Sequence, residues 1–333
     1  MLLIKNHGNK MTNEADEQER NLLPMGPPPL LTQEQIHHLR YTGWLALDLP
    51  PHLATPLQAL SQSAAHFFDE PRDVKTKRYP HRKGVLNSFQ IVPEEKEFIT
   101  LRHANGDPDF ELETHASQVW AEAGKLLHRV LCDIGRAAGV RDDAWNHLVA
   151  QSLSLPEDRS RIGPGDVTSQ LRLFCYYPDS GTAEQHVDVG LLTLCVGDGA
   201  GLQMLDRPQL PAHWVDAQGP IILVGEMLRK LLPGRVNAGP HRVIGNANGR
   251  ASTVFALRPF LGQSTDLATF GGEGVVDTKA MFNGVRDSKF DVNAKRDERE
   301  RQREALVARH RGDQVGDVDE DARNDSAGAE DLP

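Results

Sequence analysis

The spacing of apolar positions changes about halfway along the chain. Over residues 114–138 apolar residues recur every three or four positions, which is the period of an amphipathic α-helix. Residues 56–68 have the same period, and Thr32 and Gly43 fit the N-cap and the stop of another helix. From Leu171 onward, short apolar runs such as LRLFCYY, GLLTLCV and STVFALRP alternate with Gly, Pro and Asp. The pattern predicts N-terminal helices followed by the short strands of a sandwich or jelly roll.

The two ends of the chain differ in composition from its middle. Residues 1–30 are polar and then rich in proline, a composition that buries too little apolar surface to offset the cost of ordering. The C-terminal block is densely charged with both signs, which is typical of a solvated helix running into an acidic tail. We therefore expect a flexible segment over 1–30, a region of helices and strands over 31–150, a jelly-roll domain over 165–292 and a charged, disordered tail over 293–333.

Composition narrows the range of partners. The 333 residues carry a formal net charge of -10, whereas a nucleic-acid surface needs clustered basic residues. The first apolar run is too short for a signal peptide, and no run approaches the roughly 20 apolar residues of a membrane helix. Three scattered cysteines do not form the framework of a disulfide-rich protein. We expect a cytoplasmic monomer that binds a small molecule and neither nucleic acid nor membrane.

Two candidate metal ligands stand two residues apart, at His186 and Asp188. On a β-strand this spacing places both side chains on one face, where they can reach one metal ion. The motif alone is weak, because a chain with this many His and Asp contains it about once by chance. A third imidazole, His241, follows on a later predicted strand of the same barrel. Two histidines and one carboxylate leave coordination positions open, as an oxygen-activating iron(II) requires.

The segment from Leu171 to Pro259 resembles the 2-oxoglutarate and iron(II)-dependent dioxygenases, in the branch that includes isopenicillin N synthase. Short motifs in the family's order carry the resemblance: YYP, HVDVGLLTL, GLQ, VGEML, HRV and RAS. The gaps of 53 residues from Asp188 to His241 and of nine from His241 to Arg250 are also of the family's size. Weaker similarity in HFFDEPRDVKTKRYP and EEKEFITLR extends the resemblance over about residues 35–262.

This resemblance implies a fold, a metal and a reaction. The implied fold is α+β, with a double-stranded β-helix (jelly roll) as its core and a helical region before it. The implied reaction uses iron(II), O2 and 2-oxoglutarate to hydroxylate, desaturate or cyclise a small organic substrate, of the kind found among secondary metabolites and hormones. The implied iron ligands, which would also be the catalytic residues, are His186, Asp188 and His241.

By the same resemblance, Arg250 and Ser252 hold the distal carboxylate of 2-oxoglutarate. A guanidinium matches a carboxylate through two parallel hydrogen bonds, and a neighbouring hydroxyl adds another. Tyr176 and Tyr177 are adjacent, so only one of them can face the interior from a strand. The resemblance selects Tyr177 as the residue that adds its hydroxyl to the same carboxylate.

Two other functions stay open at this point. One is an oxidase that uses the same iron site without 2-oxoglutarate, and the other is a non-catalytic binding protein on a decayed oxygenase fold. A zinc hydrolase is disfavoured, because the resemblance assigns all three ligands to iron.

Overall fold

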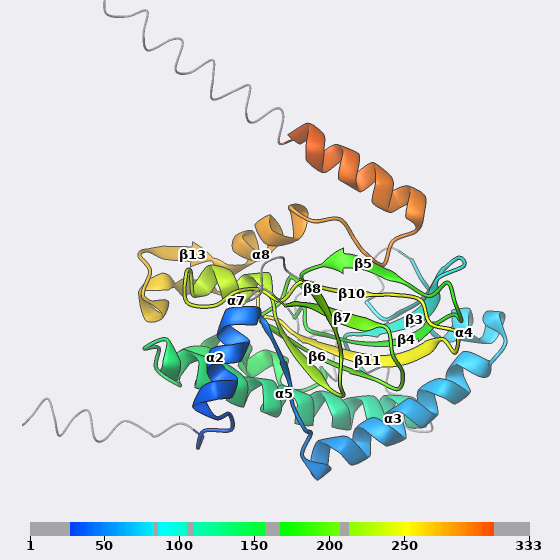
Figure 1. Ribbon diagram of the computed structural model, residues 1–333, viewed down its shortest axis with the longest axis horizontal. Helices are drawn as coiled ribbons and strands as arrows, with labels where there is room; N and C mark the ends of the chain where they lie inside the picture. The colour runs from blue at the N-terminus through cyan, green and yellow to red at the C-terminus, as the bar shows by residue number, and fades with distance from the viewer. Residues whose placement is uncertain (1–26, 83–85, 105–109, 157–166, 207–212, 310–333) are drawn as a thin grey trace, which may run out of the picture.

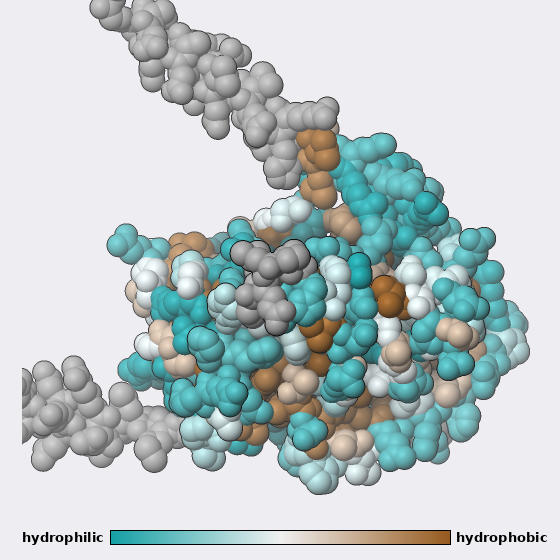
Figure 2. All heavy atoms as spheres, in the orientation of Figure 1, coloured by the Kyte–Doolittle hydropathy of each residue, from teal (hydrophilic) through white to brown (hydrophobic). Residues whose placement is uncertain are grey.

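The centre of the protein consists of two antiparallel sheets that pack face to face (Figure 1). The helices α3 and α5 cover the outer side of the larger sheet, where they contact β11 and β6. On the face seen in Figure 2 most residues are hydrophilic, and hydrophobic ones gather near the middle, over the strands. This computed structural model describes residues 27–82, 86–104, 110–156, 167–206 and 213–309.

The larger sheet has seven strands in the order β1-β9-β6-β11-β4-β3-β2. Its strands belong to both halves of the chain, so the sheet crosses the division that we expected between 31–150 and 165–292. The strands are β1 (Trp44–Ala46), β2 (Ser88–Val92), β3 (Lys96–Leu101), β4 (Gln170–Tyr176), β6 (Leu192–Gly197), β9 (Ile221–Val224) and β11 (Arg250–Leu257).

The smaller sheet has four strands in the order β5-β10-β7-β8. Buried side chains of both sheets, such as Phe174 and Leu223 from the larger and Met204 and Val243 from the smaller, form one cluster between them. This pair of sheets is the double-stranded β-helix core that the sequence predicts. The strands are β5 (Ala183–His186), β7 (Leu202–Asp206), β8 (His213–Asp216) and β10 (His241–Val243).

Helix ends follow the local signals of the sequence. Thr32 caps α2 (Gln33–Thr42) in a capping box with Gln35, and Gly43 ends it in the left-handed region at φ 84°. The helix predicted over 56–68 begins earlier, as α3 (Pro51–Asp69), because a proline in the first turn has no N–H to leave unpaired. The remaining helices of the N-terminal half are α4 (Arg72–Arg78), α5 (Glu111–Ala137), α6 (Ala144–Val149) and the 3-10 turn η1 (Ala150–Ser152).

The long helix α5 is the amphipathic helix that the apolar spacing predicts. Its buried Trp120 packs against Phe255 of β11 with ring centroids 5.0 Å apart, and the Trp120 indole donates a hydrogen bond to the carbonyl of Ser152. Asp133 of the same helix accepts hydrogen bonds from the backbone N–H groups of Leu30 and Leu31. The expected flexible segment 1–30 therefore ends in residues that pack on α5, and residues 1–26 lie outside the described part of the chain.

Several elements follow or interrupt the core strands. Within the described residues, none of the helices has both the length and the apolar character that a membrane span requires. These elements are α7 (Glu226–Leu231), β12 (Ser264–Asp266), η2 (Leu267–Phe270), β13 (Val275–Asp277) and α8 (Thr278–Asp287).

Residues 296–309 form a further helix, here the C-terminal helix, which lies beyond α8 and above β5 (orange in Figure 1). Its Arg299 is 3% exposed and forms ion pairs with Glu95 and Glu184. We expected a disordered tail from residue 293, whereas the structure shows an ordered segment over 293–309. The buried Arg299 holds this segment to the protein through its ion pairs with two partly buried glutamates. Residues 310–333 lie outside the described part.

Candidate metal centre and cofactor cavity

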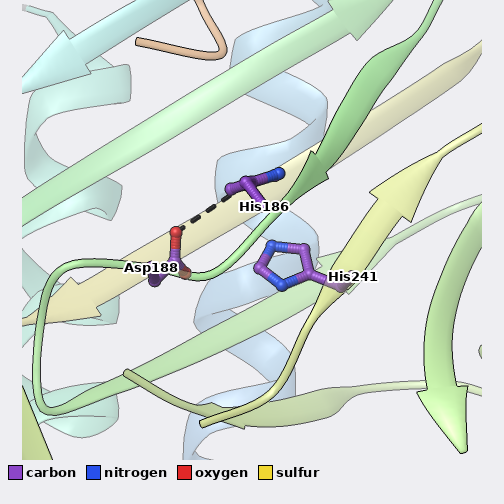
Figure 3. Close-up of side chains that lie close together, drawn as sticks. All are labelled: His186, Asp188 and His241. Carbon is purple, nitrogen blue, oxygen red and sulfur yellow. Dashed lines mark ion pairs between the residues drawn. The ribbon is translucent and has the colours of Figure 1, made fainter. Parts of the chain in front are cut away.

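His186, Asp188 and His241 converge on one point (Figure 3). One ligand atom from each lies within 4.8 Å of the others. The two imidazoles come from neighbouring strands, because His186 and His241 are paired across β5 and β10, and their ring centroids are 4.2 Å apart. Asp188 Oδ1 lies 3.9 Å from His186 Nε2. The three residues that the sequence analysis selected therefore form a group that could hold a metal ion.

The loop after β5, rather than the strand itself, positions the carboxylate. β5 ends at His186, and Asp188 lies in the loop that follows it (Figure 3), so a shared strand face is not the reason for their proximity. The Asp188 carbonyl accepts a hydrogen bond from the N–H of Glu226, 2.8 Å away, at the start of α7. Gly190 and Gly225 pack so closely that a Cβ on Gly225 would be 2.1 Å from the Gly190 carbonyl oxygen. This close packing fixes the loop that carries Asp188.

Backbone carbonyls set the orientation of both imidazoles. His186 Nδ1 donates to the carbonyl of Glu184 at 2.7 Å, and His241 Nδ1 donates to the carbonyl of Gly239 at 3.0 Å. A carbonyl can only accept, so the proton of each ring is on Nδ1 and the lone pair is on Nε2. Such hydrogen bonds hold metal-binding histidines in one tautomer and one orientation. Both rings thus offer Nε2 as a ligand.

Electrostatics favour the metal-binding protonation states. Burial lowers the pKa of His186 well below its usual value, and the neighbouring His241 lowers it further. Burial alone would raise the pKa of Asp188, but the adjacent His241 and His186 outweigh this effect and hold it below the usual range. At neutral pH His186 is therefore a neutral imidazole and Asp188 a carboxylate. Divalent metal ions bind these forms.

The three side chains line a cavity of about 860 Å³ between the two sheets. This volume is within the usual range for a site that binds a small molecule. Arg250, Ser252 and Tyr176 line the same cavity, on the wall formed by β4 and β11. Arg250 is paired with Tyr176, and Ser252 follows two residues along β11, so all three share one face of the larger sheet.

Arg250 is a buried cation with unused hydrogen-bonding capacity. It is 7% exposed, its Nη1 donates to the carbonyl of Gly199 at 2.7 Å, and its buried Nε has no partner among the described residues. The guanidinium lies over Gly197, where a Cβ would be 2.0 Å from Nη2. Ser252 is paired with this same glycine. A buried arginine with a free donor and a neighbouring hydroxyl matches a carboxylate ligand.

The structure corrects the choice between the two adjacent tyrosines. Tyr176 is buried and lines the cavity, while Tyr177 is not part of the cavity wall and is only partly buried. The alternation along β4 explains the difference: Tyr176 shares its parity with Phe174 and Arg172, which also line the cavity. Tyr176, and not Tyr177, is therefore the tyrosine whose hydroxyl could reach a ligand in the cavity.

Sequence reasoning missed five arginines that line the cavity: Arg102, Arg172, Arg258, Arg286 and Arg309. Arg102, Arg172 and Arg258 line the cavity together with the metal-binding group. Strand parity could have indicated two of them, since Arg172 shares its face with Tyr176, and Arg258 shares its face with Arg250. A charged residue inside an apolar run such as LRLFCYY is itself unusual, because an unpaired charge is costly to bury.

The C-terminal helix also contributes to the cavity wall and was not assigned any role. Its mixed charges gave no apolar stripe from which to predict packing against the core. The residues that reach the cavity from this helix are Gln302, Ala305, Leu306 and Arg309.

The fold, but not the sequence, is similar to that of known proteins. The sequence matches no protein-family model and no curated protein sequence. Neurospora crassa T7H, solved in complex with α-ketoglutarate and 5-formyluracil, is similar with a TM-score of 0.59 and 16% identity, covering 76% of this chain and 88% of that one. A Caulobacter crescentus protein assigned to the 2OG-Fe(II) oxygenase family has a TM-score of 0.61 and 20% identity over 76% and 92% of the chains.

JOX2, solved in complex with 2OG, Fe and JA, has a TM-score of 0.53 and 16% identity, covering 69% of this chain and 71% of that one. All of these identities are low, so the likeness establishes a shared fold. The fold is that of proteins solved with 2-oxoglutarate bound, and in one case with iron.

Proposed function

We propose that this protein is an iron(II)- and 2-oxoglutarate-dependent dioxygenase that oxidises a small organic substrate. The observation that carries the proposal is the convergence of His186, Asp188 and His241 within 4.8 Å, with both Nε2 atoms free to bind a metal. The likeness in fold to proteins that bind 2-oxoglutarate supports it.

The donor set fits iron(II). Two imidazole nitrogens and one carboxylate oxygen occupy one face of a metal ion and leave the opposite face for exogenous ligands. His186 and His241 reach the ion from paired strands, and Asp188 reaches it from the loop beside them. A structural zinc site would instead be closed by a fourth protein ligand, and the described residues place no further His, Cys, Asp or Glu in this group.

The start of β11, at Arg250, fits the co-substrate. Arg250 and Ser252 would bind the distal carboxylate of 2-oxoglutarate, with Tyr176 beside them. The free Nε of Arg250 is a buried donor that a carboxylate oxygen would satisfy. When bound, iron(II) and 2-oxoglutarate supply the oxidising chemistry, in which O2 is reduced and 2-oxoglutarate is converted to succinate and carbon dioxide.

The protein itself positions the metal ligands and limits the access of water. The carbonyls of Glu184 and Gly239 hold the imidazoles in one tautomer, so no ligand has to reorient when the metal binds. Apolar side chains form part of the cavity wall, and the C-terminal helix contributes to it, which would limit the access of water to a reactive oxidant. Whether the substrate is hydroxylated, desaturated or cyclised depends on its position in the cavity.

Turnover and binding together test the proposal. Purified protein should release succinate from 2-oxoglutarate only when iron(II) is present, and His186→Ala should abolish this release. His213→Ala is the matched control, because His213 is a half-exposed histidine of β8 whose ion-pair partner is Asp206. The proposal is overturned if iron(II) does not bind, or if it binds equally well in His186→Ala.

Titration with 2-oxoglutarate, under anaerobic conditions with iron(II) bound, separates the alternatives. Saturable binding that Arg250→Gln weakens supports the dioxygenase. Iron binding without 2-oxoglutarate binding would favour an oxidase that does not use this co-substrate. Binding of both without any stimulation of succinate release across a metabolite screen would favour a non-catalytic binding protein.

A further inference from the structure

The cavity has a second basic wall, at the opposite end of the β4–β11 pair from Arg250. Arg258 follows the last residue of β11, whereas Arg250 is the first residue of that strand. Arg172 lies on β4, and Arg102 directly follows β3, on the other side of β4. All three side chains face the cavity. The sheet thus carries one arginine at the proposed co-substrate end and three at the other.

The three arginines are neighbours. Arg102 donates to the side chain of Gln170 at 3.1 Å, and Gln170 is paired with Ala256, two residues before Arg258. Arg172 is the next residue on the same face of β4. Burial, with the charges of Arg102 and Arg172, lowers the pKa of Arg258 to about 9, although the charges of Asp188 and Asp291 act to raise it. Both Arg258 and Arg102, whose pKa is about 10, remain cationic at neutral pH.

Carboxylates do not neutralise this cluster in the described part of the chain. Arg102 bonds to the amide oxygen of Gln170, Arg172 to the hydroxyl of Thr100 at 3.2 Å, and Arg258 to the carbonyl of Thr168 at 3.1 Å. These partners are uncharged, and none of the three arginines forms an ion pair with a described residue. The Nε of Arg258 is buried and has no partner there at all. Converging, partly buried cations without ion-pair partners are costly unless a ligand supplies the negative charge.

The carboxylates of the same cavity offset only part of this positive charge. Asp188 belongs to the proposed metal centre, and Asp287 pairs with Arg286 at 3.0 Å. Asp291 is exposed, and its charge acts on Arg172 and Arg258 without forming an ion pair with either. With iron(II) balanced by Asp188 and 2-oxoglutarate, the three guanidiniums leave an excess of positive charge in the cavity.

We infer that the substrate is an organic anion whose carboxylate or phosphate group binds Arg102, Arg172 and Arg258. The inference rests on the proposed function, because it places this substrate between the arginine cluster and the metal centre. The substrate also has an apolar part, since Phe174, Val254 and Phe282 line the cavity beside the arginines. The anionic group would fix the orientation of the molecule, and its apolar part would extend toward His186 and His241.

Calorimetric titration of the full chain, loaded anaerobically with iron(II) and saturating 2-oxoglutarate, tests this inference. The probes are phenylacetate, phenyl phosphate and the neutral phenylacetamide, which share an aromatic ring and differ in charge. At least one anion should bind, and the amide should bind at least about 10-fold more weakly. The tighter of the two anions identifies the group that the cluster prefers. The inference is overturned if neither anion binds more tightly than the amide.

Variants locate the binding to the cluster. Arg172→Gln and Arg258→Gln should each raise the Kd of the anion by about 10- to 100-fold, since each removes charge-assisted hydrogen bonds. Arg172→Lys should have a smaller effect, because it keeps the charge but loses the planar fork. Arg296→Gln is the control, since Arg296 is an exposed arginine outside the cavity that pairs with Glu300. Equal anion binding in wild type and Arg258→Gln would overturn the inference.

A reciprocal titration distinguishes this inference from the proposed function. Arg258→Gln should bind 2-oxoglutarate as wild type does, and Arg250→Gln should lose 2-oxoglutarate but keep the anion. If iron(II) and 2-oxoglutarate bind but the anions do not, only the substrate inference fails. If the anions bind through the cluster but 2-oxoglutarate does not bind, only the proposed function fails. Thermal melting checks that each variant folds, and Arg102→Gln, on the margin of the cluster, replaces any that does not.

Discussion

Gly197 lies directly beneath the guanidinium of Arg250, so that a Cβ on Gly197 would be 2.0 Å from Nη2 and 2.1 Å from Cζ. Gly197→Ala should therefore displace the guanidinium and raise the Kd for 2-oxoglutarate by about 10-fold or more, while iron(II) affinity stays unchanged. Gly199→Ala is a matched control, because a Cβ there would meet its nearest neighbour at 3.6 Å, an ordinary contact. Equal 2-oxoglutarate affinity in both variants would contradict the assignment of Arg250.

The adjacent tyrosines of β4 offer a second comparison. Tyr176→Phe removes a hydroxyl from the cavity and should raise the Kd for 2-oxoglutarate by about 10-fold or more, the effect of losing one hydrogen bond to a charged carboxylate. Tyr177→Phe removes a hydroxyl outside the cavity wall and should leave that Kd unchanged. Titration of both proteins with iron(II) present measures the difference, and the reverse order would restore Tyr177 to the site.

Lys96 makes the free energy of unfolding depend on pH, and a variant can separate this contribution from those of other groups. Its side chain is fully buried, donates to the carbonyl of Thr182 at 3.0 Å, and has its pKa lowered by burial from 10.5 to about 8. The unfolded chain thus binds more protons than the folded one between these values. The free energy of unfolding should rise with pH across this window by about 3 kcal/mol, and the gain should be lost as the pH falls through 8.

Lys96→Met removes this contribution while keeping the volume of the side chain. The difference in the free energy of unfolding between wild type and Lys96→Met should grow in favour of wild type from pH 8 to pH 10.5. Urea unfolding of both proteins across this range measures it, and subtraction cancels the titration of other groups. A difference that is constant with pH would show that Lys96 does not have a lowered pKa.

Arg299 attaches the C-terminal helix to the core. It is 3% exposed and pairs with Glu95 at 2.6 Å and with Glu184 at 2.9 Å. Arg299→Met leaves both carboxylates without this partner and should cost about 2 kcal/mol, less than a fully buried pair because Glu184 is half-exposed. Hydrogen exchange over 296–309 should become faster.

Arg301→Met provides the comparison for Arg299, since Arg301 lies on the same helix with an exposed side chain. Its effect on the free energy of unfolding should stay within about 0.5 kcal/mol. Unchanged hydrogen exchange over 296–309 in Arg299→Met would mean that other contacts hold this helix.

Local sequence signals predict the elements well where one side of the chain is buried. The capping box at Thr32, the left-handed Gly43 and the apolar stripe of α5 each depend on residues close together in sequence. The strands β4, β6 and β11 follow from apolar runs between turn residues. The convergence of the candidate metal ligands was also predictable, because His186 and Asp188 form a local motif and the resemblance supplied His241.

Features that depend on contacts between distant parts of the sequence were harder to predict. The arginine cluster depends on which strands are adjacent, since Arg102 and Arg258 become neighbours of Arg172 only through the pairing of β3, β4 and β11. The packing of 296–309 depends on two partners, Glu95 and Glu184, that lie more than a hundred residues away in sequence. Neither feature produces a periodic spacing of apolar residues, so the sequence alone does not indicate it.

The seven-stranded sheet has a consequence for dividing this chain into fragments. β1 extends the sheet beyond β9, and β3 with β2 extends it beyond β4, so the N-terminal half supplies the outer strands on both sides. A fragment limited to 165–292 would leave the backbone hydrogen-bonding groups of β9 and β4 open to pairing with other chains, which promotes aggregation. Separately expressed halves would then be soluble only when mixed, as two pieces that reassemble one continuous sheet.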